Sequence, residues 1–81
     1  MERPAPSHVL DTSGTFCPVP IVKTAAFLRG MAPEEVLMVI ATDPGIASDM
    51  PAFCKAARHE FIGIDREEGI FRAWLRKRGA P

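Results

Sequence analysis

An uninterrupted apolar run from Val36 to Ala41 constrains the fold of this chain more than any other feature. The run holds two valines and an isoleucine, which favour strands, and it is too short to indicate a helix. Asp43-Pro44-Gly45 follows shortly after and breaks regular structure. Because polar residues do not alternate with the apolar ones, the pattern predicts a central strand at residues 36–42 that is covered on both faces.

The segments on either side of this strand alternate between strand and helix patterns, separated by turn residues. In chain order the sequence predicts a strand at His8–Asp11, a helix from Pro18 that is capped by Gly30, the central strand, a helix starting at Ala47, Ser48 or Asp49, and strands at Phe61–Asp65 and Ile70–Leu75, joined by a four-residue connection at Arg66–Gly69.

The order β-α-β-α-β-β limits the topology. Right-handed crossovers that advance in one direction place both helices on one face of the sheet. The final hairpin then places the fourth strand antiparallel between the second and third. We therefore expect an α/β fold, a two-layer sandwich with a mixed four-stranded sheet. The helix-free face carries Trp74, and it either meets a second subunit or partner or is ordinary exposed apolar surface.

Helical spacing also predicts which side chains face the core. In the first helix the expected apolar face is Ile21, Val22, Ala25, Ala26 and Leu28, with Lys23, Thr24 and Arg29 off it. In the second helix the expected stripe is Met50, Phe53, Cys54, Ala56 and Ala57.

Composition places the chain in an ordinary class. Its 81 residues suit one domain at 8–78, with a proline-containing flexible arm at 1–7 and a tail at 79–81. Lysines and arginines number ten, as do aspartates and glutamates, so no net charge draws the protein to nucleic acid or membrane. With no signal-peptide pattern and two cysteines without close spacing, we expect a cytoplasmic protein.

Cys17 stands where a glycine turn at Gly14 leads into Pro18-Val19-Pro20. Pro18 suits the first helical position, which makes Cys17 the N-cap at the positive end of the helix dipole, where a thiolate is favoured. Because Pro20 lacks an N–H, only the Val19 amide remains to bond to the sulfur. A helix end lowers a thiol pKa by less than about one unit, so a larger shift needs a cation such as Lys23 or a partner protein. The alternative is a small buried core cysteine.

Cys17 and Asp43 are expected at the same edge of the sheet, because helix N-termini and strand C-termini meet there. A nucleophile on such a rim is accessible to another protein. Asp43 is expected to bond the amides that follow it and to contact a partner, and Asp11 is expected to form a turn. Together with Asp43, three residues form a possible docking rim: Phe16, Val19 and Lys23.

The chain resembles the TusA (SirA-like) sulfur-carrier family from Leu10 to Arg78. The residues that carry this resemblance are Leu10-Asp11, Gly14, Cys17-Pro18-Val19-Pro20, Thr42-Asp43-Pro44, Asp49-Met50-Pro51, Phe53-Cys54, His59 and Arg76-Lys77. The chain departs from the family pattern at Thr15, Val19 and Ser48, which lie on or near the presumed docking rim.

The resemblance implies a sulfurtransferase that holds sulfane sulfur as a persulfide on Cys17, with Gly14, Pro18 and Pro20 shaping the site. It implies a protein donor of cysteine desulfurase or rhodanese type and a protein acceptor cysteine, and it calls for no metal or organic cofactor. The family's pathways are tRNA thiolation, molybdenum-cofactor assembly and dissimilatory sulfur transfer. We expect a monomer or weak dimer.

Other functions for the same residues remain open. Cys54 is expected in the core, and it could pair with Cys17 only if their Cα atoms came within about 7 Å. His8, Cys17, Cys54 and His59 lack the short paired spacings of a zinc site. Two rival classes are a small nucleic-acid-binding domain, favoured by basic residues in the C-terminal half, and a regulatory interaction module in which Cys17 has no chemical role.

Overall fold

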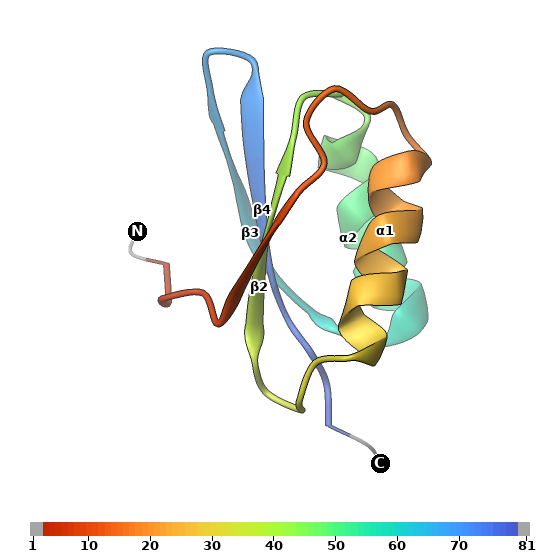
Figure 1. Cartoon of the computed structure of the whole chain (residues 1–81), viewed down its shortest axis with the longest axis vertical. Coiled ribbons are helices and arrows are strands. Elements are labelled where there is room, and N and C mark those ends of the chain that lie inside the picture. The colour runs from red at the N-terminus through yellow and green to blue at the C-terminus, as the bar shows by residue number, and fades with distance from the viewer. Residues whose placement is uncertain (1–2, 80–81) are drawn as a thin grey trace.

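Two helices cover one face of a four-stranded sheet in this computed structural model, which describes residues 3–79 (Figure 1). The elements are β1 (His8–Asp11), α1 (Val19–Arg29), β2 (Val36–Ala41), α2 (Ile46–Ala57), β3 (Glu60–Glu67) and β4 (Ile70–Arg76). The predicted order and the two-layer α/β sandwich are confirmed. Within the described residues, neither helix is long and apolar enough to cross a membrane.

The strands lie side by side in the order β1-β2-β4-β3. β1 runs parallel to β2, and β4 runs antiparallel to both β2 and β3, which confirms the predicted mixed sheet. The hairpin between β3 and β4 is tighter than predicted. Pairing continues to Glu67 and Ile70, and Glu68 and Gly69 turn the chain with φ of 51° and 79°. Positive φ at both positions matches the right-handed twist of the strands, so two residues replace the expected four.

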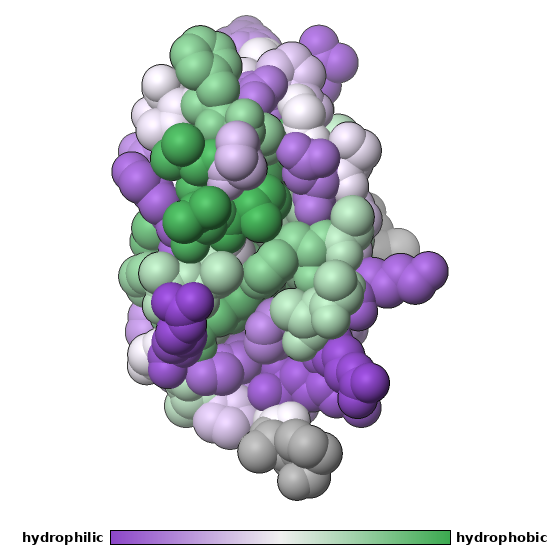
Figure 2. Space-filling view, turned by 90° about the vertical axis from the view of Figure 1, so that its right-hand side faces the viewer, coloured by the Kyte–Doolittle hydropathy of each residue, from purple (hydrophilic) through white to green (hydrophobic). Residues whose placement is uncertain are grey.

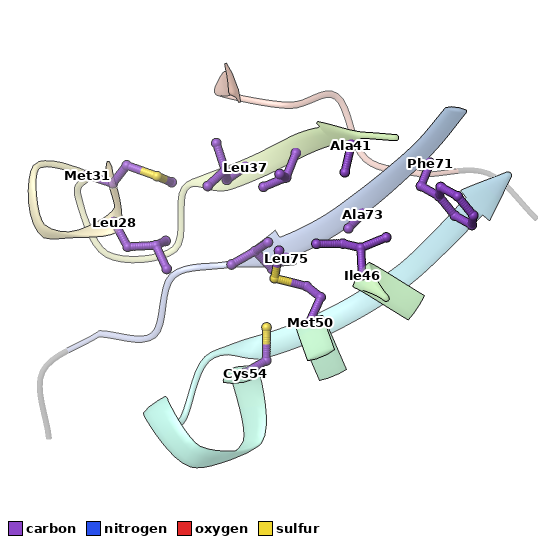
Figure 3. Packing of buried hydrophobic residues seen from close by; sticks show 11 residues of the cluster. Leu28, Met31, Leu37, Ala41, Ile46, Met50, Cys54, Phe71, Ala73 and Leu75 are labelled. Atoms are coloured by element: carbon purple, nitrogen blue, oxygen red, sulfur yellow. The ribbon is translucent and has the colours of Figure 1, made fainter. Parts of the chain in front are cut away.

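The core lies between the sheet and the helices (Figure 3). β2 and β4 send alternate side chains into it, and α2 meets them with side chains spaced four residues apart. Its fully buried members include Leu37, Val39, Ala41, Ile46, Met50, Cys54, Ala73 and Leu75. Cys54 points from α2 towards the sheet, so the prediction of a core position is confirmed.

The predicted face of α1 is wrong in three places. Thr24 is fully buried, whereas Val22 is 63% exposed and Ala26 is also exposed. The helix turns Pro20, Thr24 and Leu28 inwards at four-residue spacing. Thr24 tolerates burial because its hydroxyl donates a hydrogen bond to the Pro20 carbonyl at 2.8 Å.

The predicted stripe of α2 is partly wrong. Met50 and Cys54 are buried and Phe53 is half-buried, but Ala56 and Ala57 at the end of the helix are exposed. The helix begins at Ile46, one residue before the predicted range, and Ile46 supplies a buried side chain that the stripe omitted.

The segment before β1 lies against the helix-free face of the sheet. The Arg3 guanidinium donates to both carboxylate oxygens of Asp65, at 2.9 and 3.3 Å, and to the Ile62 carbonyl. Gly63 leaves room for it, since a Cβ there would overlap the guanidinium. Of the arm predicted at 1–7 and the tail predicted at 79–81, residues 1–2 and 80–81 lie outside the described residues. The flexibility of the arm stays a prediction.

Candidate functional site

Cys17 is half-buried in the loop that joins β1 to α1. The prediction that Pro18 opens the helix and Cys17 caps it is wrong by one residue, because α1 begins at Val19 and Pro18 is its N-cap. The Val19 amide donates to the Phe16 carbonyl at 2.9 Å and so is not a donor to the sulfur. A turn closed between Phe16 and Val19 therefore comes before the helix and carries the cysteine.

Asp43 fixes the backbone of Cys17. Its Oδ2 accepts a hydrogen bond from the Cys17 amide at 2.7 Å, and its Oδ1 accepts one from the Gly45 amide at 3.1 Å. The bond to Gly45 confirms the predicted capping role, and Asp43 lies at the sheet edge expected for it. The bond to Cys17 was not predicted from the sequence. The only sequence signal for this bond was the expectation that Cys17 and Asp43 lie at the same edge of the sheet. The parallel pairing of β1 and β2 brings the ends of these two strands together there.

The loop ahead of Cys17 is tied to the same edge. Gly14 has φ of 81°, a conformation that favours glycine, and its amide donates to the Thr42 hydroxyl at 3.0 Å. The Ser13 amide donates to Asp11 Oδ1 at 2.8 Å, so the predicted turn at Asp11 is confirmed. The buried Thr12 hydroxyl donates to the Ile40 carbonyl at 2.6 Å. These bonds hold the loop on the end of β2.

The electrostatic surroundings of Cys17 are opposite to the prediction. Burial raises the pKa of the thiol to about 11, and hydrogen bonding with Asp49 and the charges of Asp49 and Asp43 act in the same direction. Lys23 is exposed on α1 and is not among the groups that shift this pKa. The helix end is too weak to offset two carboxylates and desolvation. The thiol is therefore protonated at neutral pH in the free protein.

Asp49 was not predicted as a site residue. It lies in the first turn of α2, where an acidic side chain stabilises the helix by interacting with the helix dipole. That role alone explains an aspartate at this position in the sequence. Only the packing of α2 beside the Cys17 loop gives it a second role.

Exposed apolar side chains surround the start of α1. Phe16 is 76% exposed, Val22 is 63% exposed and Val19 is 41% exposed. Figure 2 shows hydrophobic surface gathered over the upper part of the helical side, at the end where α1 begins. Phe16 and Val19 were predicted on this rim, but Val22 was assigned to the core. We call Phe16, Val19 and Val22 the apolar rim.

The remaining cysteine and the histidines have other surroundings. Cys54 is 1% exposed, and burial raises its thiol pKa to about 11. His8 Nε2 lies 3.0 Å from Glu35 Oε1, and His59 Nδ1 accepts a hydrogen bond from the Arg78 amide at 3.2 Å. The structure thus gives both histidines partners of their own, and it keeps Cys54 in the core.

The family model and two similar relatives point to the same family. Residues 8–77 match the family described as Sulfurtransferase TusA. A sulfur carrier protein TusA from Pseudomonas syringae pv. tomato is 41% identical over 70 residues, which cover 86% of this chain and 83% of that protein. A putative sulfur carrier protein, YrkF, from Bacillus subtilis is 44% identical over 71 residues, covering 88% of this chain but only 38% of its own length.

A solved structure shares the fold. The crystal structure of a SirA-like protein from Desulfitobacterium hafniense superposes with a TM-score of 0.74, covering 88% of this chain and 97% of the other. Sequence identity in that comparison is 15%, so it supports the fold alone.

Proposed function

Because the chain belongs to the Sulfurtransferase TusA family, we propose that Cys17 carries sulfane sulfur as a persulfide between a donor protein and an acceptor protein. The observation that carries the proposal is the position of Cys17. Its amide is anchored by Asp43, its thiol is free and half-buried, and the apolar rim lies next to it. A reactive sulfur on such a rim suits contact with another protein.

The proposed transfer is an exchange between sulfur atoms. The Cys17 thiolate attacks the terminal sulfur of a donor persulfide, a new sulfur–sulfur bond forms on Cys17, and the donor sulfur–sulfur bond breaks. The donor cysteine leaves as a thiolate with the bonding electron pair and takes up the proton that Cys17 gave up. The step therefore consumes no oxidant or reductant. An acceptor thiolate repeats the same attack on the Cys17 persulfide.

The high thiol pKa sets a condition on the donor. Asp43 and Asp49 disfavour the thiolate in the free protein. A cationic group of a docked donor that faces these carboxylates would offset their charge and lower the thiol pKa. Cys17 would then become nucleophilic in the complex, which restricts transfer to a partner that fits the rim.

The partners and pathway that we propose are those that the family resemblance implies. A cysteine desulfurase or a rhodanese-type protein is the proposed donor, and a protein cysteine in tRNA thiolation, molybdenum-cofactor assembly or dissimilatory sulfur metabolism is the proposed acceptor. We propose a cytoplasmic location, because the two free cysteines suit a reducing compartment. The proposed oligomeric state is a monomer or weak dimer.

Intact mass measures the loading directly. Wild type, Cys17→Ser and Cys54→Ser are incubated with a cysteine desulfurase and cysteine without reductant. We expect wild type and Cys54→Ser to gain the mass of one sulfur atom and Cys17→Ser to gain none. A rhodanese with thiosulfate serves as the second donor. If neither donor loads wild type, or if Cys17→Ser is loaded as well, the proposed role of Cys17 is wrong.

A further inference from the structure

A concave site lies at the end of the molecule opposite to Cys17. Asp43, which anchors Cys17, lies two residues after the end of β2, whereas the cavity includes Arg76, which pairs with Val36, the first residue of β2. The cavity has a volume of about 410 Å³. It lies between the end of α2, the start of β3 and the end of β4. The proposed sulfur transfer at Cys17 does not use this cavity.

Positive side chains dominate this cavity. Of nine lining residues, five are basic and two are glutamates, so the lining carries three more positive than negative charges. His59 adds none at neutral pH, because burial and the nearby Lys77 lower its pKa. The whole chain has no net charge, so this is a local concentration. Figure 2 shows hydrophilic side chains gathered at the lower end of the helical side. The basic lining residues are Lys55, Arg58, Arg76, Lys77 and Arg78.

Among the residues that the structure describes, three of these cations have no partner of opposite charge. Arg76 pairs with Glu60 at 3.1 Å, and the Lys77 ammonium donates to the Met31 carbonyl at 2.6 Å. Within residues 3–79, the side chains of Lys55, Arg58 and Arg78 make no ion pair or side-chain hydrogen bond. Several uncompensated charges around one concavity repel one another, and a bound anion would relieve that repulsion.

The backbone that carries these charges is held in place. Lys77 is bonded through its amide to Glu35 and through its carbonyl to Glu34, and the Arg78 amide donates to His59 Nδ1. Arg58 has φ of 64° at the end of α2, and its amide bonds to the Cys54 carbonyl. The cations therefore come from the ends of α2 and β4, which packing holds side by side.

From this arrangement we propose that the cavity is a binding site for a phosphate group. Arginine forks match phosphate oxygens with paired hydrogen bonds, and three of the five basic residues are arginines. A phosphate ester carries up to two negative charges, so it offsets the excess charge better than one carboxylate does. The volume leaves room for the group that bears the phosphate. The site acts independently of Cys17.

Backbone-amide NMR titrations at constant ionic strength test the site. The probes are inorganic phosphate, uridine 5′-monophosphate and a short single-stranded RNA, with acetate as the carboxylate comparison. We expect the phosphate probes to shift Arg58, His59 and Arg78 with saturation, and acetate to act more weakly. The double variant Lys55→Gln/Arg58→Gln should bind about tenfold more weakly or worse, whereas Arg66→Gln, at the far hairpin, should bind like wild type.

The probes also separate the sources of the phosphate. Mononucleotide binding as tight as RNA binding indicates a small ligand, and much tighter RNA binding with a steep salt dependence indicates a nucleic acid. Cys17→Ser should bind as wild type does, so a failure of the carrier proposal leaves this result unaffected. Shifts that do not saturate, that match those with acetate, or that persist in the double variant would overturn the proposal.

Discussion

Asp43 Oδ2 lies 2.7 Å from the amide nitrogen of Cys17, so one carboxylate both positions the cysteine and places a negative charge beside its thiol. Its other oxygen caps Gly45 at the start of α2. The backbone of the site is thus ordered by the same group that opposes ionisation of the sulfur. In the free protein the thiol of Cys17 is therefore held in a defined position but is mostly protonated at neutral pH.

Removing the carboxylates one at a time should lower the Cys17 pKa. We expect Asp49→Asn to lower it more than Asp43→Asn, because Asp49 contributes more to the raised value. Each unit of decrease multiplies the thiolate fraction, and hence the alkylation rate below the pKa, by about ten. The measurement is the pH dependence of iodoacetamide alkylation. Asp65→Asn, away from the thiol, is the matched control, and an unchanged or higher pKa in Asp49→Asn contradicts the prediction.

The apolar rim should matter for transfer and not for folding. Phe16→Ser and Val22→Ser remove exposed side chains, so the free energy of unfolding should stay within about 0.5 kcal/mol of wild type. Sulfur loading from a donor protein should slow, because the contact surface is reduced. Val9→Ser is the control, since Val9 is 51% exposed on β1. If Phe16→Ser and Val22→Ser are loaded as fast as wild type and Val9→Ser, the rim is not a docking surface.

The N-terminal segment should loosen when Gly63 acquires a side chain. In Gly63→Ala the new Cβ overlaps the Arg3 guanidinium, which must shift, so the bonds of Arg3 to Asp65 should weaken. Arg3→Ala removes the same bonds from the other side, and the double variant should add little to either. Hydrogen exchange and limited proteolysis of residues 3–7 measure the release. Full additivity of the two changes would show that they act on separate contacts.

Acid should destabilise the site through its carboxylates. Hydrogen bonds from the Cys17 and Gly45 amides lower the pKa of Asp43, and bonds from Ser13 lower that of Asp11. A lowered folded pKa contributes stability above the ordinary aspartate value of 3.8, and this stability is lost as the pH falls through the folded pKa. Urea unfolding across this range should show the decline. Asp43→Asn should be less stable at neutral pH and decline less steeply, and a slope equal to wild type would exclude Asp43 as a contributor.

Much of the fold could be predicted because its signals are local. The apolar run of β2, the glycine after α1 and the turn residues each act on their immediate neighbours. The face of α1 could not be predicted in the same way. Hydropathy ranks Val22 above Thr24, but the bond from the Thr24 hydroxyl to the Pro20 carbonyl makes threonine acceptable inside and leaves Val22 at the surface.

By itself the sequence determined the order of the elements, the edge of the sheet where Cys17 and Asp43 lie, and the turns around them, since steric limits and short-range hydrogen bonds decide these features. Only the tertiary structure decided the charge around Cys17 and the gathering of cations at the opposite end. Both depend on residues distant in sequence: Asp49 of α2 beside the Cys17 loop, and Arg58 just after α2 beside Arg78 after β4. Electrostatic interaction depends on distance in space, which the packing of α2 sets here.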